Sequence, residues 1–242
     1  RIRSRGLGDV YKRQMKISAI IVAAGSSRRM GFDKLEADLD GESVLARSMM
    51  AFQSYPEVVE IRVVTSPEKI EAVTETAQRL GLDKFVEVIE GGAERHLSVH
   101  AGLSRVAGEI DLVAVHDGAR PLVSARAISL CASAAAETGA ATLAHRVADT
   151  LKRGNDRGEV DGAVSRDNLW GMETPQIFKL ELLHEAYETV IERGDLVTDE
   201  VSALEAVGHP IKLVENPDPN LKITVPGDLV VAEAAFRAQA ED

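Results

Sequence analysis

The chain has 242 residues, one cysteine and a formal net charge of −11 at pH 7. This length can bury a large core in one or two domains, and the acidic balance argues against nucleic acid or an anionic membrane as the main partner. A single cysteine excludes an intramolecular disulfide and fits a reducing cytoplasm, and no apolar run is long enough to span a bilayer.

Residues 1–14 differ from the rest of the chain. They are basic, show no periodicity and precede Met15, and they lack the apolar centre of an export signal. We interpret them as a non-native or disordered leader, with an arginine-rich transit peptide as the alternative. We expect residues 15–242 to form a single domain, because strand-like and helix-like segments alternate throughout.

The stretch 17–34 organises the chain. It begins as a near-continuous apolar run that ends at Ala24-Gly25, as expected of a parallel strand buried on both faces. Two serines follow, and then three cations, Arg28, Arg29 and Lys34. Open α/β sheets bind ligands at the carboxyl ends of strands, and backbone amides with fixed cations suit phosphate. The stretch predicts a phosphate site; the alternative is a glycine turn with solvated arginines.

Two common phosphate motifs do not describe this loop. Gly25 is not followed by the Gly-Lys-Ser/Thr of a P-loop, and Ser27 and Met30 stand where the dinucleotide fingerprint requires glycines. The order Ala23-Ala24-Gly25, two serines, two arginines and Met30, with Lys34 shortly after, instead resembles the signature loop of nucleotidyltransferases.

The segments that follow alternate in type. Residues 43–54 predict a helix that Ser43 caps, 61–65 a strand, 66–80 a helix with a proline near its start, and 85–89 another strand. Such alternation implies right-handed crossovers and a parallel sheet with helices on both faces.

A glycine pair, Gly91-Gly92, follows the strand at 85–89. It exposes backbone amides, and a helix with Arg95 and Ser98 in its first turns begins behind it. Main-chain amides in such a loop can hydrogen-bond the edge of a nucleotide base. An ordinary helix cap is the alternative interpretation.

The next buried strand, 110–115, leads into Asp117 and the loop Arg120-Pro121. An acid at the carboxyl end of a central strand is well placed to meet a metal or a ribose, although Asp117 alone could equally be a surface acid or a helix cap. Residues 127–137 then predict a helix, in which the neighbours of Cys131 indicate a buried thiol and not a nucleophile.

The chain changes character at about 147–172. Residues 147–153 and 162–170 flank a polar turn and predict a β-hairpin that projects from the sheet. A two-stranded ribbon is marginal alone in water, so we expect this arm to pack on a partner, most simply a second copy of the chain. Trp170 either anchors the arm or caps the core.

The C-terminal third completes the predicted fold. We expect helices at 180–193, from 197 with Thr198 as the cap, and at 226–240, and a strand at 211–214. Lys222, in a short extended segment with apolar neighbours, is expected to point into a cleft. The fold class is therefore α/β, a Rossmann-like and mainly parallel sheet with helices on both faces and a projecting β-hairpin arm.

Five separated blocks carry a more specific resemblance: 23–34, 91–99, 115–121, 174–176 with 198–200, and 222–224. Together they resemble the 2-C-methyl-D-erythritol 4-phosphate cytidylyltransferases of the non-mevalonate isoprenoid pathway. The resemblance covers roughly residue 16 to the end. It implies transfer of CMP from CTP to 2-C-methyl-D-erythritol 4-phosphate with Mg²⁺ or another divalent cation, in a cytoplasmic homodimer.

The resemblance also implies roles for individual residues. It implies Arg29 and Lys34 as stabilisers of the transition state, and Arg166 and Lys222 as groups that position the acceptor. The nucleotide side comprises Ala23, Ala24, Gly25, Gly92, Ala93, Ser98, Asp117 and Ala119, with Asp117 also at the metal. The acceptor side comprises Arg120, Thr150, Arg166, Thr174, Thr198 and Lys222.

The chain departs from the family pattern at several positions. Leu35 follows the loop lysine where glutamine is frequent, Ala93 follows the glycine pair where an acid can occur, and Glu173 replaces a commoner glutamine. None of these departures removes a cation that the chemistry needs. Two alternatives stay open: another nucleotidyltransferase, such as a molybdenum-cofactor cytidylyltransferase, and a non-catalytic nucleotide-binding protein.

Overall fold

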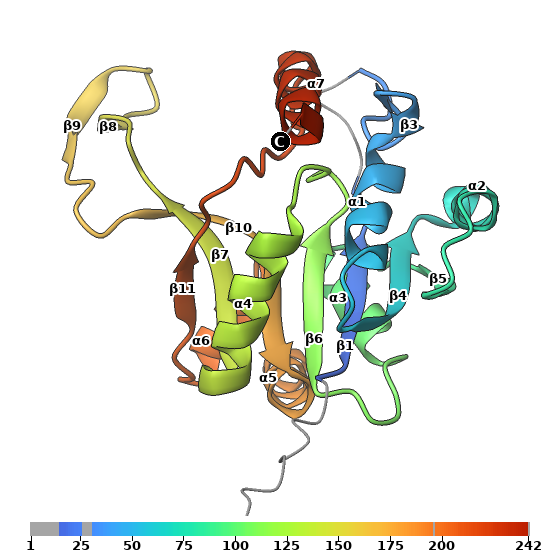
Figure 1. Cartoon of the computed structure of the whole chain (residues 1–242). Helices are drawn as coiled ribbons and strands as arrows, with labels where there is room; N and C mark the ends of the chain where they lie inside the picture. Colours follow the sequence, from blue (N-terminus) through green and yellow to red (C-terminus); the bar gives the residue numbers. More distant parts are fainter. Residues whose placement is uncertain (1–14, 26–30, 196, 242) are drawn as a thin grey trace, which may run out of the picture.

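The computed structural model describes residues 15–25, 31–195 and 197–241, with side chains to 238. The large strands of this part of the chain are β1 (Ile17–Val22), β4 (Val58–Thr65), β5 (Phe85–Glu90), β6 (Leu112–Asp117), β7 (Ala140–Arg146), β10 (Trp170–Lys179) and β11 (Lys212–Glu215). They form one sheet in the order β11-β7-β10-β6-β1-β4-β5 (Figure 1). The predicted leader, residues 1–14, lies outside the described residues.

The sheet is mainly parallel, as predicted, and β10 is its exception. β1 pairs in parallel with β4 and β6, β4 with β5, and β7 with β11, whereas β10 runs antiparallel to both of its neighbours, β6 and β7. The antiparallel direction places the first half of β10 beside the carboxyl end of β6. The α/β fold class expected from the sequence is confirmed.

Helices cover both faces of the sheet. They are α1 (Val44–Gln53), α2 (Ile70–Arg79), α3 (Arg95–Leu103), α4 (Ala125–Thr138), α5 (Leu180–Arg193), α6 (Glu200–Ala206) and α7 (Pro226–Glu241), with a 3₁₀ turn at Pro67–Lys69 before α2. Figure 1 shows α1 and α4 in front of the sheet and α3 and α6 behind it. This arrangement follows from the crossover connections that parallel strands require.

The pleat of the central strands divides the core in two. In β1, Ala19 and Ile21 face the cluster that includes α1, α2, α4 and α7, while Ile20 faces the cluster that includes α3, α5 and α6. In β6, Ala114 and Val115 divide in the same way. Successive side chains of a strand point to opposite faces, so an uninterrupted apolar run is what a strand covered on both sides needs.

Helix termini follow their capping residues, with one correction. Ser43 caps α1 as predicted, since its hydroxyl accepts the N–H of Ala46 at 3.1 Å. Thr198 was predicted to cap the helix at 197–204, and that prediction is wrong. The helix begins at Glu200, and the carboxylate of Asp199 accepts the N–H of Ser202 at 2.9 Å. A carboxylate also complements the positive end of the helix dipole.

The predicted hairpin arm is present. Its strands are β8 (Leu151–Gly154) and β9 (Val160–Val164), and the arm extends away from the body between the ends of β7 and β10 (Figure 1). Val160 on the arm is 72% exposed. At its root, the guanidinium of Arg146 lies 4.3 Å from the centre of the Trp170 ring, so Trp170 anchors the arm to the end of β7.

A further short antiparallel pair, β2 (Asp38–Leu39) and β3 (Glu42–Ser43), precedes α1. Across the residues described here, none of the helices combines the length and the apolar character needed to cross a membrane.

Cys131 is predicted to be unreactive in the folded protein. Burial raises the pKa of its thiol well above the usual value, and the side chain is fully enclosed between α4 and the sheet. We expect no reaction with Ellman's reagent at pH 8 in the native state, and reaction of one thiol per chain in guanidinium chloride. Stoichiometric labelling before unfolding would contradict the burial of Cys131.

Candidate active site

The parallel strands β1, β4, β5 and β6 end at the same edge of the sheet. A cavity of about 480 Å³ opens at this edge. It is lined by Val22, Ala23, Ala24, Gly25, Lys34, Leu35, Gly92, Ala93, Glu94, Arg95, Ser98, Asp117, Ala119 and Lys222. All of the residues predicted to contact nucleotide therefore lie around one space, together with Lys34 and Lys222.

Two loops meet at one wall of the cavity because both carry small residues. A Cβ atom on Gly91 would lie 2.6 Å from the Cβ of Ala24 and 2.9 Å from the hydroxyl of Ser98. The loops are also joined to β4, since Ala23 donates to the carbonyl of Val64 at 2.7 Å and Gly91 to that of Thr65 at 2.8 Å. A glycine is thus required at position 91 for the backbones to approach so closely.

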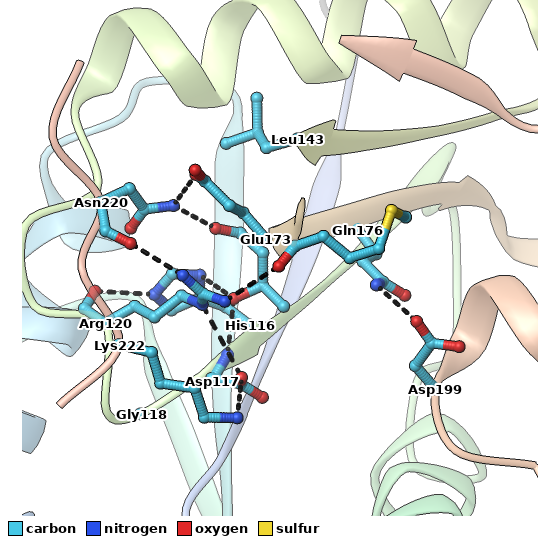
Figure 2. A network of polar contacts seen from close by, with 12 residues as sticks. His116, Asp117, Gly118, Arg120, Leu143, Glu173, Gln176, Asp199, Asn220 and Lys222 are labelled. Carbon is cyan, nitrogen blue, oxygen red and sulfur yellow. Dashed lines mark hydrogen bonds and ion pairs between the residues drawn. The ribbon is translucent and has the colours of Figure 1, made fainter. Parts of the chain in front are cut away.

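Asp117, the last residue of β6, is the electrostatic centre of the cavity. Its carboxylate lies 2.7 Å from the ammonium of Lys222, 3.3 Å from the guanidinium of Arg95 and 3.8 Å from that of Arg120. Figure 2 shows Lys222 directed at Asp117. Burial raises the pKa of Asp117, but the surrounding cations outweigh it and hold this pKa well below its usual range. Asp117 therefore stays ionised at any working pH.

Lys34 approaches the same space from the loop after β1. Its ammonium donates to the carbonyl of Ile223 at 2.9 Å, which ties this loop to the segment that carries Lys222. The backbone around Lys34 is also held in place. The carboxylate of the preceding residue, Asp33, pairs with Lys69 and accepts the N–H of Leu35 at 3.1 Å. Two lysines from distant parts of the chain are thus held at neighbouring positions of the cavity wall.

Arg95 is clamped between two carboxylates. Its guanidinium lies 2.7 Å from Glu200, which is fully buried, as well as 3.3 Å from Asp117. The hydroxyl of Tyr187 donates to the same oxygen of Glu200 at 3.0 Å. Burial lowers the pKa of Arg95, but the two carboxylates outweigh this effect and raise it. Arg95 is therefore a permanent, immobile cation beside Asp117.

A chain of hydrogen bonds supports Asp117 from behind. The N–H of Asp117 donates to the hydroxyl of Thr174 at 3.0 Å, and this hydroxyl lies 3.0 Å from Nδ1 of His116. Nε2 of His116 lies 3.0 Å from the carbonyl of Arg120, which can only accept. Nε2 therefore carries the proton, and Nδ1 accepts from Thr174. His116 has both nitrogens occupied and is not available as a base.

The comparison with known proteins settles the family. The profile of the family IspD, 2-C-methyl-D-erythritol 4-phosphate cytidylyltransferase, matches residues 17–238. The chain belongs to this family. The similarity spans nearly all of the described fold, so the two alternatives considered from the sequence no longer apply.

Individual relatives agree with this membership. The chain is 40% identical over 230 residues to a 2-C-methyl-D-erythritol 4-phosphate cytidylyltransferase of Caldanaerobacter subterraneus, covering 92% of this chain and all of the relative. It is 37% identical over 229 residues to one of Alkaliphilus oremlandii, with 93% and 97% covered. The crystal structure of a 4-diphosphocytidyl-2C-methyl-D-erythritol synthase from Anaerococcus prevotii superposes with a TM-score of 0.80 at 28% identity, covering 93% and 99%.

Not all of the residues that the cytidylyltransferase resemblance implied line the cavity. Arg120 and Thr174 lie behind Asp117, where their polar groups bind the protein. Thr150 and Arg166 lie exposed at the arm, and Thr198 lies exposed before α6. Arg29 lies outside the described residues. The roles of these six residues stay predictions.

Arg95, which lines the cavity, and Glu200, which pairs with it from behind, were given no role in the sequence analysis. Arg95 was noted only as part of the loop after Gly91-Gly92, and Glu200 only as part of a matching block. The signal for Arg95 was its place in the first turn of a helix behind a glycine pair. The pairing with Glu200 joins residues 105 positions apart and depends on the packing of α6 against α3.

His116 predicts a pH dependence of stability. Burial lowers the pKa of His116 to about 4, from the usual 6.5 of a solvated histidine. Between these values the unfolded chain binds a proton that the native chain does not, so the free energy of unfolding falls as the pH falls from 6.5 to 4. The expected slope from this group is roughly 1.4 kcal/mol per pH unit.

Urea unfolding at stepped pH in metal-free buffer measures this contribution. We expect His116→Gln, which cannot titrate, to lose stability less steeply than the wild type over that window. Parallel curves for the two proteins would show that His116 does not carry the effect.

Proposed function

We propose that the cavity at the carboxyl edge of the sheet binds CTP and presents its α-phosphate to 2-C-methyl-D-erythritol 4-phosphate. The chain has the activity of its family: it transfers CMP to this acceptor, giving 4-diphosphocytidyl-2-C-methyl-D-erythritol and pyrophosphate, in the non-mevalonate pathway. The observation that carries the proposed site is the convergence of Lys34, Lys222 and Arg95 with one ionised carboxylate on a single cavity.

The acceptor needs no general base. Its nucleophile is a phosphate monoester, whose second pKa is about 6, so it is largely ionised near neutral pH. This fits a cavity with no histidine among its lining residues, within the described part of the chain. What the reaction requires is that two anions are held in line while negative charge grows at the α-phosphate. Lys34, and Arg29 by family resemblance, would stabilise that charge.

The cytidine would lie against the loops at positions 24 and 91–93. Small residues there, Ala24, Gly92 and Ala93, leave the backbone amides accessible, so the base edge would be read by main-chain groups. Ser98 supports this loop, because its hydroxyl lies 3.4 Å from the carbonyl of Gly92 and can donate to it. The ribose would lie toward Asp117 and Ala119.

Asp117 would also be the protein ligand of Mg²⁺. An ionised carboxylate suits this hard cation, and Mg²⁺ is usually held by one or two carboxylates together with substrate phosphates. Asp117 provides such a carboxylate, at the end of β6 in the lining of the cavity. When bound, the cation would neutralise phosphate charge. Asp117 and the substrate phosphates would hold it.

The arm would complete the site of a second copy of the chain. Its two strands are exposed, and Arg166 lies at its base, where its guanidinium donates to the carbonyl of Ala148. We therefore propose a homodimer in which Arg166 and Thr150 serve the acceptor site of the partner. Thr198 and Lys222 would contribute to the acceptor side from the body, and Arg120 and Thr174 would position Asp117.

Residues 15–242 are proposed to work as one domain with the arm at about 147–172. A cytoplasmic location also stays a prediction.

Pyrophosphate release tests the catalytic proposal. With 2-C-methyl-D-erythritol 4-phosphate present, we expect release from CTP and much less from UTP, ATP or GTP. Lys34→Ala should reduce turnover by about a hundredfold or more, because it removes a cation aimed at developing charge, with the circular dichroism spectrum unchanged. Lys16→Ala is the control, since Lys16 lies at the opposite end of β1 in an exposed pair with Glu109. Equal turnover of Lys34→Ala and wild type would refute the role of Lys34.

Mixing two inactive variants tests the arm. Arg166→Ala should weaken use of the acceptor. If Arg166 acts across a dimer, heterodimers of Lys34→Ala and Arg166→Ala contain one intact site, so an equal mixture should recover roughly a quarter of the wild-type activity. Sedimentation measures the oligomeric state. Failure to recover activity after subunit exchange, or a fully active monomer, would rule out a shared site.

A further inference from the structure

Glu173 on β10 is a buried acid that the proposed chemistry does not use. One carboxylate oxygen lies 2.8 Å from Nδ1 of His145, and the other accepts from the amides of Asn216 at 2.8 Å and Asn220 at 2.9 Å. The partners come from the end of β7, from the residue after β11 and from the segment that leads to Lys222. A buried carboxylate is costly unless it is paired, so these contacts fix three segments to one strand.

Asn220 is the member of this network nearest to the cavity. Its side-chain NH₂ group donates to Glu173 and, at 2.8 Å, to the carbonyl of Thr174, while the main-chain carbonyl of Asn220 accepts from the guanidinium of Arg120 at 2.8 Å. Figure 2 shows Asn220 held between Glu173 and Arg120. The Glu173 carboxylate and the Thr174 carbonyl can only accept hydrogen bonds, so the NH₂ group of Asn220 must face them.

Lys222 follows Asn220 by two residues. Its segment is fixed again beyond the lysine, where Ile223 donates to the carbonyl of Ala119 at 2.9 Å. With Asn220 held on one side and Ile223 on the other, the direction of Lys222 toward Asp117 is set by these two contacts. Three contacts hold Asn220, and among them the carboxylate of Glu173 is the one side-chain acceptor of its amide.

We propose that Glu173 is a positioning residue that sets Lys222 for the acceptor phosphate by holding Asn220. Neighbouring residues of β10 thereby position both members of the Asp117–Lys222 pair. Thr174 receives the N–H of Asp117, and its neighbour Glu173 holds the segment of Lys222. The inference rests on the proposed function only in assigning Lys222 to the acceptor.

Two substitutions at position 173 test the inference. Glu173→Leu removes the carboxylate oxygen that both asparagine amides share and leaves Asn220 with the carbonyl of Thr174 alone. We expect the KM for 2-C-methyl-D-erythritol 4-phosphate to rise by about tenfold or more, since small displacements of positioning groups are costly. Glu173→Gln keeps one acceptor oxygen for the asparagines and turns its amide toward His145, which can accept as the other tautomer. It should retain near wild-type kinetics. Direct CTP binding should change little in either variant.

A control substitution and a double variant test whether the effect of Glu173→Leu is a general loss of structure. Glu215→Leu makes the same substitution at the end of β11, where Glu215 pairs with the exposed Arg146, and should leave the acceptor KM unchanged. In a Lys222→Ala background, Glu173→Leu should cause little further loss, because its effect passes through Lys222. Full additivity, or an unchanged KM in a folded Glu173→Leu protein, overturns the inference. If Glu173→Leu does not fold, Asn220→Ala breaks the same contact from the other side.

Hydrogen exchange separates this inference from the proposed function. We expect faster exchange in the peptide 216–224 of Glu173→Leu than in the wild type or Glu215→Leu, whatever Lys222 does in catalysis. Faster exchange together with wild-type acceptor use by Lys222→Ala would retain Glu173 as the anchor of this segment and remove the catalytic assignment of Lys222. Unchanged exchange would remove Glu173 as the anchor.

Discussion

The structure depends on one buried carboxylate that is kept charged. Asp117 ends a central strand, where burial alone would favour its neutral form, and Arg95, Lys222 and Arg120 converge on it from three segments. Two of these cations are held in turn by other groups of the protein: Arg95 by Glu200 and Arg120 by main-chain carbonyls. An acidic chain thus keeps positive charge at one edge of its sheet. Cations that are already held in place stabilise a bound anion most strongly, because they do not have to reorganise when it binds.

Local patterns were sufficient to predict most of the fold. The apolar run of β1, the alternation of strands and helices, and the polar turn of the arm each reflect a rule that acts over a few residues. β10 was harder: the sequence analysis assigned no strand to residues 172–176, yet they belong to a ten-residue strand between β6 and β7. Pro175 and the polar residues around it concealed the strand, because proline and buried polar groups are unusual in a central strand.

The candidate site was predictable only in part, for a related reason. Residues that line the cavity through their backbone or small size, such as Ala24 and Gly92, stand in recognisable loops. Residues that act through a partner distant in sequence have no such local pattern. The pair of Arg95 with Glu200 and the network of Glu173 form only when the elements pack together, so the sequence alone does not predict them. The error at Thr198 was a matter of one position, because Asp199 is the stronger acceptor for the helix N-terminus.

The enclosed position of the single thiol has a practical consequence. Cys131 is buried on the inner side of α4, whereas the tip of the arm near Asp156 is exposed and lies outside the seven-stranded sheet. A cysteine introduced at the tip would therefore be the one site open to a maleimide spin label or fluorophore, without first removing the native sulfhydryl. In the proposed homodimer, spectroscopic distances between two such labels would report the spacing of the two arms in solution directly.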